Sequence, residues 1–519
     1  MLKMLGAAGA FALLIVAPAC TDLTETPQSA ITPENFYRNE DEVIGGLASV
    51  YAQLRTTDDE YWNTSEISTD ELIVPTRGQD WYDNGKWLDI HGQTFTPTSP
   101  AGLDNINSAW VNMFQGVARA NVVLDGIANT SFASKATVTA ELRVLRAWYY
   151  FLLMDMFGGV PIATDPSIAA RPQETRDSVF RFIEGELKAS RPDLPTTWPS
   201  TMNGRITQGA VDAMLASLYL NAQVFTGTVS ATGLAPGAAR WQDAVTEANL
   251  VINSGVYQLA TNTTANCSTT GCGWRSNFTA DNYKSPEIIF AVKYINTSGL
   301  GLNFLMRTLH YNQYDSPAPW NGYATLADTY AAFDNNDQRK QIFLVGPQIN
   351  LVTGLPAKDR QGNPLIFTPD IPNVTAATEG QGVRIDKWPI DPAHVQQDNG
   401  NDYAWFRLGE MYLIRAEANN ELGNTAAAIA DLNLIRARAF NPPQPTTAVT
   451  QAQVRDAILN ERLFEFTWEG KRRQDLVRAG KFTSGTWYAK TTSTPFRVLF
   501  PIPQTQIETN PQLKQNPGY

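Results

Sequence analysis

Apolar residues recur at helical spacing in several long stretches of the chain. Within 136–157, Leu142, Leu145, Trp148 and Leu152 step by three and four residues, which places them on one face of a helix. The same spacing predicts further helices over 41–55, 105–128, 207–225, 241–253, 403–422, 425–439 and 451–468. The pattern therefore predicts a mainly α-helical protein.

Two of these predicted helices form a recognisable pair. The segments 403–422 and 425–439 are separated only by a Gly-Asn turn, and Ala416 is small enough to let two helices approach closely. Amphipathic helix pairs with a short glycine turn are typical of tetratricopeptide-like repeats. A single pair leaves one apolar face uncovered, so we expect several pairs to stack into a scaffold.

Two regions, 56–103 and about 260–400, carry little helical periodicity. Turn-forming residues alternate there with aromatic ones, and strand-like pieces appear only at 287–294 (EIIFAVKY) and 382–387. We interpret both regions as long loops on the helical scaffold. Long ordered loops usually serve function rather than connection.

The first twenty residues have the layout of a secretory signal. Lys3 precedes an apolar run from Leu5 to Val16, and small residues precede Cys20. The run is too short to span a bilayer, so we expect a signal peptide at 1–19 and an exported mature chain. Cys20 stands where a bacterial lipoprotein carries its lipid, and a plain secretory signal is the alternative.

Composition and charge narrow the classes of partner. The chain has 519 residues, with 40 Lys and Arg against 51 Asp and Glu, for a net charge of −11. An acidic chain offers no electrostatic field to phosphates, so we expect no nucleic-acid partner. Only three histidines are present, which disfavours catalysis by histidine.

The two remaining cysteines, Cys267 and Cys272, lie in a Gly/Thr/Asn-rich loop. In an exported protein a local disulfide between them is the expected state. A zinc site is the weaker alternative because zinc takes about four ligands and the histidines are scattered. We predict no metal site and no cofactor.

Eight sequence blocks, in order, resemble the RagB/SusD family of nutrient-uptake outer-membrane lipoproteins and cover nearly the whole mature chain. They are ELRVLRAWYYFLLMDMFGGVPI (141–162), GRITQGAVDAMLASLYLNA (204–222), WQDAVTEANLVINSGVYQL (241–259), SPEIIFAVKY (285–294), YAAFDNNDQRK (330–340), FRLGEMYLIRAEANNELGNTAAAIADLNLIRARA (406–439), ILNERLFEFTWEGKRRQDLVRAG (458–480) and LFPIPQTQIETNPQLKQNPGY (499–519). The resemblance implies a SusD-like fold with four tetratricopeptide-like helix pairs. We divide the mature chain into an N-terminal region, 20–226, and a C-terminal region, 227–519, with its ligand-facing loops at about 260–400 and its helical part at 401–480.

The resemblance also implies a place and a partner. A lipidated Cys20 would hold the chain on the outer face of the outer membrane. The partner would be a SusC-type TonB-dependent barrel, over which the protein acts as a hinged lid. The ligand would be an oligosaccharide or, in some relatives, a peptide, and the protein would bind it without catalysis.

The aromatic loops supply the chemistry that a sugar ring needs. The face of an exposed Trp or Tyr accepts sugar C–H groups, and each such stack contributes on the order of 1 kcal/mol. Polar side chains beside the ring then bind the hydroxyls. The candidate ligand-binding residues are Trp81, Tyr82, Asp83, Asn84, Trp87, Tyr314, Trp320 and Tyr323. The alternative is that these aromatic residues pack the loops onto the scaffold.

Two other functions compete with glycan capture. A glycoside hydrolase would need a pair of carboxylates in the loops, such as Asp80 or Asp83 with Asp315. A helical-repeat scaffold would bind protein partners only. Glu461 and Glu465, one helical turn apart, are interpreted as members of a structural ion-pair network. The acidic run 334–337 lacks the spacing of a calcium loop.

Overall fold

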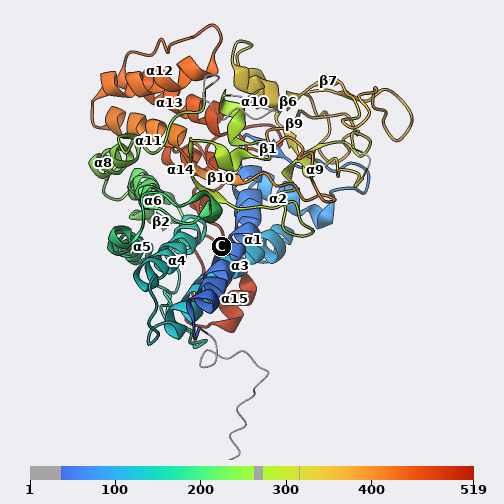
Figure 1. The fold of residues 1–519 in the computed structure, drawn as a ribbon. Coiled ribbons are helices and arrows are strands. Elements are labelled where there is room, and N and C mark those ends of the chain that lie inside the picture. Colours follow the sequence, from blue (N-terminus) through green and yellow to red (C-terminus); the bar gives the residue numbers. More distant parts are fainter. Residues whose placement is uncertain (1–36, 262–272, 315) are drawn as a thin grey trace, which may run out of the picture.

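The computed structural model describes residues 37–261, 273–314 and 316–519 (Figure 1). The fold is mainly α, as the sequence predicts. The helices within these ranges are α1 (Glu40–Ile67), α2 (Lys86–His91), α3 (Asn107–Gly126), α4 (Lys135–Phe157), α5 (Arg176–Ser190), α6 (Gln208–Leu220), α7 (Ala222–Phe225), α8 (Trp241–Ile252), α9 (Phe304–Thr308), α10 (Ala327–Ala332), α11 (Leu408–Glu421), α12 (Thr425–Ala439), α13 (Gln451–Phe466), α14 (Arg472–Arg478) and α15 (Gln504–Thr509).

Four helix pairs build the scaffold. They are α1 with α3, α4 with α5, α6 with α8, and α11 with α12, and the pairs continue into one another through the contacts of α3 with α4, α5 with α6 and α8 with α11. Figure 1 shows α4, α5, α6, α8, α11 and α12 along one side of the molecule, together with the short strands of residues 228–235, and most of the long loops and other short strands toward the opposite side. Gly423, with φ +84°, forms the turn between α11 and α12 that the sequence predicts.

Helix α1 is longer than predicted, because residues 56–67 continue the helix instead of opening a loop. This stretch is rich in Thr, Asp, Asn and Ser, which have low intrinsic helix propensity. Tertiary hydrogen bonds override that preference: the Asp58 carboxylate accepts from the Tyr294 hydroxyl at 3.1 Å, and the Asn63 Oδ1 accepts from the Tyr323 hydroxyl at 2.7 Å. Trp62 is consequently a core residue of the helix.

The strands of the described ranges form five two-stranded antiparallel sheets. The pairs are β1 (Leu72–Ile73) with β5 (Ala324–Thr325), β2 (Thr228–Ser230) with β3 (Gly233–Ala235), β4 (Ile288–Val292) with β10 (Tyr403–Arg407), β6 (Phe343–Leu344) with β9 (Arg384–Ile385), and β7 (Gly346–Pro347) with β8 (Ile366–Phe367). The predicted strand segments 287–294 and 382–387 contain β4 and β9. Helix α5 and the short helices α2, α9, α10, α14 and α15 were not predicted.

The start of the helix predicted over 403–422 is wrong. Residues 403–407 form β10, which pairs Tyr403 with Val292 and Arg407 with Ile288. Every residue of β10 is buried. A continuous buried run of this length has no periodicity that separates a strand from a helix, so the pattern could not distinguish them.

The main hydrophobic core of the described residues contains side chains from Tyr37 to Leu513, and three smaller hydrophobic clusters are separate from it. Trp62 stacks on Phe304 with ring centroids 4.2 Å apart, and its indole Nε1 donates to the backbone carbonyl of Trp468 at 2.8 Å. The N-terminal helix, the central loops and the C-terminal region therefore share one interior. The region boundary at 226 stays a prediction.

Several predicted features lie outside the described residues: the signal segment 1–19, Cys20, Cys267, Cys272 and Asp315. Within the described ranges, no helix combines the length and the apolar character needed to cross a membrane.

Candidate functional site

The two predicted aromatic loops, 77–87 and 310–323, lie against each other. They are brought together by the pairing of β1, which precedes the first loop, with β5, which follows the second. The indole Nε1 of Trp81 donates to the backbone carbonyl of Trp320 at 2.7 Å, and Arg77 Nε donates to that of Asn321 at 2.9 Å. Segments distant in the chain therefore form one surface.

Trp81 is held in an unusual backbone conformation. Its φ is +61°, in the left-handed region that bulky residues rarely adopt. The indole lies over Gly322, where any Cβ atom would overlap the ring. Trp81 remains half-buried, so part of the ring stays open to solvent.

Trp87 and Tyr323 lie beneath Trp81, with ring centroids 5.7 and 5.2 Å from it. Both are buried, and their polar atoms are engaged: Trp87 Nε1 donates to Asp83 Oδ2 at 2.6 Å, and the Tyr323 hydroxyl donates to Asn63. Burial raises the pKa of Tyr323 above its ordinary value. Neither ring offers a face to a ligand, so the packing alternative describes these two candidates.

The other candidates of the first loop are exposed. Tyr82 keeps 58% of its surface accessible, and Asp83 and Asn84 follow it in a tight 3₁₀ turn. Asp83 and Asn84 have φ values of +38° and +58°. The turn projects Asp83 and Asn84 as exposed polar groups next to the rings, which suits hydrogen bonding to hydroxyls.

Tyr314 and Trp320 are half-buried in the second loop. The Tyr314 hydroxyl lies 2.5 Å from His394 Nε2, and the backbone N–H of Trp320 donates to the carbonyl of Met306 at 2.7 Å. The Tyr314 side chain is thus held at its hydroxyl and the Trp320 backbone at its N–H, while both residues remain partly accessible.

A polar network that the sequence reasoning missed borders these loops. The Tyr311 hydroxyl donates to Asp80 at 2.5 Å, Arg360 pairs with Asp80 at 3.1 Å and also with Glu379, and His310 Nε2 lies 2.9 Å from Glu379. Burial tends to raise the pKa of Glu379, but hydrogen bonds from Arg360 and His310 outweigh it, so this pKa lies below its ordinary value. Arg360 and Glu379 lie in a segment without any motif, and no sequence signal pointed to them.

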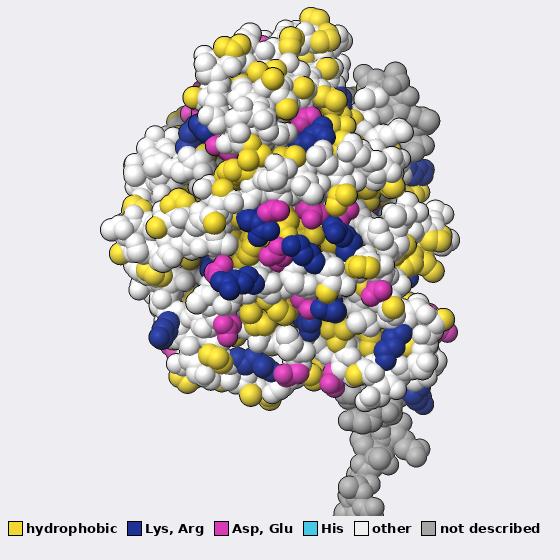
Figure 2. All heavy atoms as spheres, turned by 90° about the vertical axis from the view of Figure 1, so that its left-hand side faces the viewer, with side chains coloured by type: hydrophobic (Ala, Val, Ile, Leu, Met, Phe, Trp, Pro, Cys, Tyr) yellow, Lys and Arg dark blue, Asp and Glu magenta, His cyan; other side chains and the backbone are white. Residues whose placement is uncertain are grey.

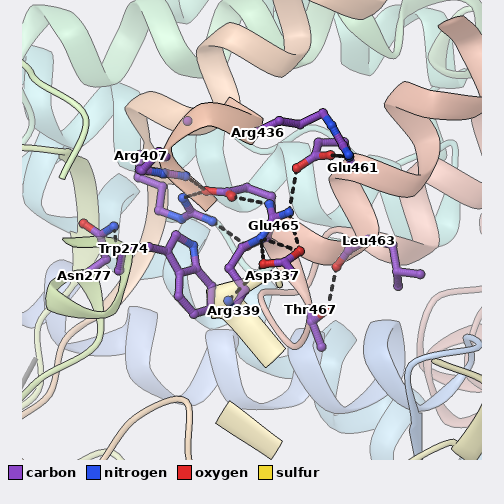
Figure 3. Close-up of polar contacts among 12 residues, drawn as sticks. Trp274, Asn277, Asp337, Arg339, Arg407, Arg436, Glu461, Leu463, Glu465 and Thr467 are labelled. Carbon is purple, nitrogen blue, oxygen red and sulfur yellow. Dashed lines mark hydrogen bonds and ion pairs between the residues drawn. The ribbon is translucent and has the colours of Figure 1, made fainter. Parts of the chain in front are cut away.

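Glu461 and Glu465 lie elsewhere, in a buried ion-pair network (Figure 3). Arg339 pairs with Glu461 at 2.7 Å and with Glu465 at 2.8 Å, and Arg407 and Arg438 also pair with Glu465. Burial opposes the charge of Glu465, yet the surrounding guanidinium groups hold its pKa well below its ordinary value. Both carboxylates are at most 1% exposed, so a sugar cannot reach them.

The structural interpretation of Glu461 and Glu465 is confirmed, and their partners are not the arginines that lie nearest to them in the sequence. Arg462 pairs with Asp475, Arg472 with Asp70, and Arg473 with Asp155, while the partners of the two glutamates are Arg339, Arg407, Arg436 and Arg438. Asp337, from the acidic run, pairs with Arg339. In the described ranges no three His, Cys, Asp or Glu side chains are arranged for a metal ion.

The helical side of the molecule carries a separate cavity of about 490 Å³ between α7, α11, α13 and α14. Its floor is apolar, with Trp241 and Phe482 among the lining residues. Its rim charges pair with one another, as in Glu421 with Arg455 and Glu417 with Arg478. Figure 2 views this side and shows acidic and basic groups gathered around hydrophobic ones.

Two family models match the chain. The model described as the SusD family matches residues 243–519, and the model described as starch-binding associating with outer membrane matches residues 26–220. The chain therefore belongs to the SusD family, as its sequence blocks indicated.

Relatives and solved structures agree with this assignment. The chain is 26% identical to the starch-binding protein SusD of Bacteroides thetaiotaomicron over 88% of this chain and 85% of that protein. It is 22% identical to SusD-like protein P25 of Formosa agariphila, with 96% of each covered. The crystal structure of a SusD-like protein from Bacteroides fragilis superposes with a TM-score of 0.74 at 21% identity, covering 94% of this chain and all of that one.

A further similar structure is a complex with a sugar. Surface glycan-binding protein A from Bacteroides thetaiotaomicron, in complex with laminarihexaose, has a TM-score of 0.69 and 21% identity and covers 92% of this chain and 99% of that one. At this identity the similarity establishes a common fold.

Proposed function

We propose that this protein binds oligosaccharides on an aromatic platform formed by Trp81, Tyr82, Tyr314 and Trp320. Trp87 and Tyr323 support the platform from beneath, and Asp83 and Asn84 hydrogen-bond sugar hydroxyls at its edge. The names of the relatives, which include a starch-binding protein and a glycan-binding protein, support an oligosaccharide as the ligand.

The conformation of Trp81 is the observation that carries this proposal. A non-glycine residue held in the left-handed region costs on the order of 1–3 kcal/mol and persists only where the surroundings enforce it. Here the hydrogen bond to the Trp320 carbonyl and the contact with Gly322 hold the indole, and Trp81 is nevertheless not fully buried. An aromatic residue with a strained backbone that is fixed in place but not fully buried favours binding over packing.

Titration calorimetry with laminarihexaose and maltohexaose tests the platform. Removing one stacked ring from a site with several stacks is expected to weaken binding by about tenfold, which corresponds to about 1.4 kcal/mol. We expect this loss for Trp81→Ala and for Trp320→Ala. If both variants bind the better sugar as tightly as the parent, the site assignment is wrong.

Trp198 provides a matched control. It is also half-buried, and its Nε1 also donates to a backbone carbonyl, that of Ile206 at 2.8 Å, but Arg205 covers its ring at 4.0 Å. Trp198→Ala should therefore leave sugar affinity unchanged. An equal loss in this variant would mean that general destabilisation, and not the platform, explains the effect.

The proposal includes binding without catalysis. Asp80 is held by Tyr311 and Arg360, and Asp83 by Trp87, which leaves neither carboxylate placed as a free acid or base. Incubation of the pure protein with the bound sugar should give no shorter products. Product formation that is lost on Asp80→Asn would favour the hydrolase alternative.

We further propose that Cys20 carries a lipid anchor in the outer membrane and that the protein is the lid of a SusC-type TonB-dependent barrel. A ligand that contacts both lid and barrel would favour the closed state by its difference in affinity between the two states. Cys20→Ala should release the protein from membranes, and the parent should co-purify with a barrel transporter. Co-purification without binding of any sugar would favour a scaffold that binds protein only, and binding of peptides instead would change the ligand class.

A further inference from the structure

Two buried guanidinium groups that contact Asn321, in the second platform loop, are already hydrogen-bonded. Arg77 is buried, and its N–H groups donate to the backbone carbonyls of Asn321, Thr378 and Gln381. Arg384, also buried, donates to backbone carbonyls and to the Asn321 side chain at 2.9 Å. Neither guanidinium can turn toward a ligand without breaking several hydrogen bonds.

Arg360 is the guanidinium of this region that solvent can reach, with 48% of its side chain exposed. It pairs with Asp80 and Glu379, and it lies 4.3 Å from the ring centroid of Tyr311. Asp80 is itself 40% exposed and directly precedes Trp81 in the chain. An anionic ligand would therefore meet a cation whose charge is already matched.

Two further charged groups, Lys86 and Asp83, lie beside the rings of the first loop. Lys86 pairs with Asp104 at 2.8 Å and covers the Trp87 ring at 4.5 Å. Asp83 is exposed beside Tyr82. Lys358, two residues before Arg360, is exposed and makes no ion pair with any of the described residues. It serves below as a control.

We propose that the platform selects uncharged oligosaccharides and that Asp80, by holding Arg360, is the specificity-determining residue that excludes carboxylated and sulfated sugars. This inference rests on the proposed function. A sugar anion would have to displace Asp80 from Arg360 or lie unpaired near Asp80 and Asp83, and both cost free energy that an uncharged sugar does not incur.

Titrations with laminarihexaose and maltohexaose as uncharged probes and hexagalacturonate as the carboxylated probe test the inference. The parent should bind an uncharged hexamer at least about tenfold tighter than hexagalacturonate. That affinity should change little between about 50 and about 300 mM NaCl, because salt screens only interactions between charges. In Asp80→Asn the preference should shift toward hexagalacturonate by about fivefold or more, and the gain should weaken with salt.

Two further variants make the result specific. Adding Arg360→Gln to Asp80→Asn should abolish the gain, because the released guanidinium is its source. Lys358→Gln should leave the parental preference unchanged. If Asp80→Asn does not fold, as judged by its melting transition, Glu379→Gln is the replacement variant. It removes the other carboxylate partner of Arg360 and should also shift the preference toward hexagalacturonate.

The outcomes separate the two proposals. A parent that binds hexagalacturonate as tightly as the uncharged hexamers, or a folded Asp80→Asn without any shift, overturns the specificity role of Asp80 while glycan binding stands. Failure to bind any of the three sugars rejects glycan binding itself, and this inference with it.

Discussion

The indole Nε1 of Trp81 donates to the backbone carbonyl of Trp320 at 2.7 Å, although 239 positions separate the two residues. The hydrogen bond connects a loop from the N-terminal region to one from the central region, directly beside the β1–β5 pair. The geometry of the platform is therefore a property of the whole fold. A change in one loop is expected to disturb the ring presented by the other.

The close contact between the Trp81 indole and Gly322 gives the first prediction. Gly322→Ala places a methyl group where the indole lies, so Trp81 must move. Overpacking of this kind typically costs about 1–3 kcal/mol of unfolding free energy, and we expect sugar affinity to fall by about tenfold. Denaturant unfolding and titration calorimetry measure the two effects.

Gly185→Ala is the control for Gly322→Ala. Gly185 lies in helix α5 and has open space around its Cβ position, so alanine should stabilise the helix by up to about 1 kcal/mol and leave binding unchanged. Unchanged sugar affinity in Gly322→Ala would contradict the idea that the contact with Gly322 positions Trp81 for binding.

The buried ion pairs give the second prediction. Glu465→Gln leaves Arg339, Arg407 and Arg438 with less compensating charge in a buried site, and such a loss typically costs about 3–5 kcal/mol. Glu421→Gln, which breaks the exposed pair with Arg455, should cost at most about 1 kcal/mol. Urea unfolding of both variants checks the contrast, and equal small losses would show that the network is not structural.

Variants of Tyr82 and Trp87 should distinguish a ring that contacts the ligand from a ring that supports the platform. Trp87 is 6% exposed, so Trp87→Ala should cost about 3–5 kcal/mol of unfolding free energy. Tyr82 is exposed, so Tyr82→Ala should change stability by less than about 0.5 kcal/mol while it weakens sugar binding severalfold. A Tyr82→Ala variant with parental affinity would remove this ring from the platform.

A buried pair of carboxyl groups, Glu66 and Glu71, predicts a dependence of stability on pH. Burial raises the pKa of Glu66 from 4.5 to about 7, and burial together with the charge of Glu66 raises that of Glu71 well above its ordinary value. Glu66 accepts from the N–H of Gly470, and Glu71 accepts from that of Trp468 at 2.8 Å. The pair thus fixes the segment that contacts Trp62.

The sign follows from the raised pKa of Glu66. Its neutral form is favoured by folding, so its contribution is fully present below about pH 4.5 and is lost as the pH rises through about 7, by about 1.4 kcal/mol for each unit of pKa difference. Glu66→Gln should therefore lose less unfolding free energy than the parent between about pH 5 and 8. Parallel pH profiles from urea titrations would contradict this assignment.

The helical scaffold was largely readable from the sequence because apolar spacing and glycine turns act locally. The Gly423 turn between α11 and α12 illustrates this. The prediction of a loop at residues 56–67 is wrong because the helix there depends on distant partners. Asp58 and Asn63 are hydrogen-bonded by Tyr294 and Tyr323, far along the chain. Local propensity carries no information about such partners.

The sequence predicts the two aromatic loops of the candidate site but not how their side chains are arranged. Composition alone could not distinguish Trp81, which is partly exposed, from Trp87 and Tyr323, which are buried beneath it. Arg360 and Glu379 were missed because they join the site only through tertiary contacts with Asp80 and His310. Whether an aromatic ring is buried depends on which residues pack against it in the folded protein.

A crystal structure of the protein with laminarihexaose tests the central claim most directly. We predict that sugar rings lie on the open faces of Trp81 and Trp320, with hydroxyl groups within hydrogen-bonding distance of Asp83 or Asn84. A sugar bound only in the cavity between α7, α11, α13 and α14, with both indoles left uncovered, would contradict the account.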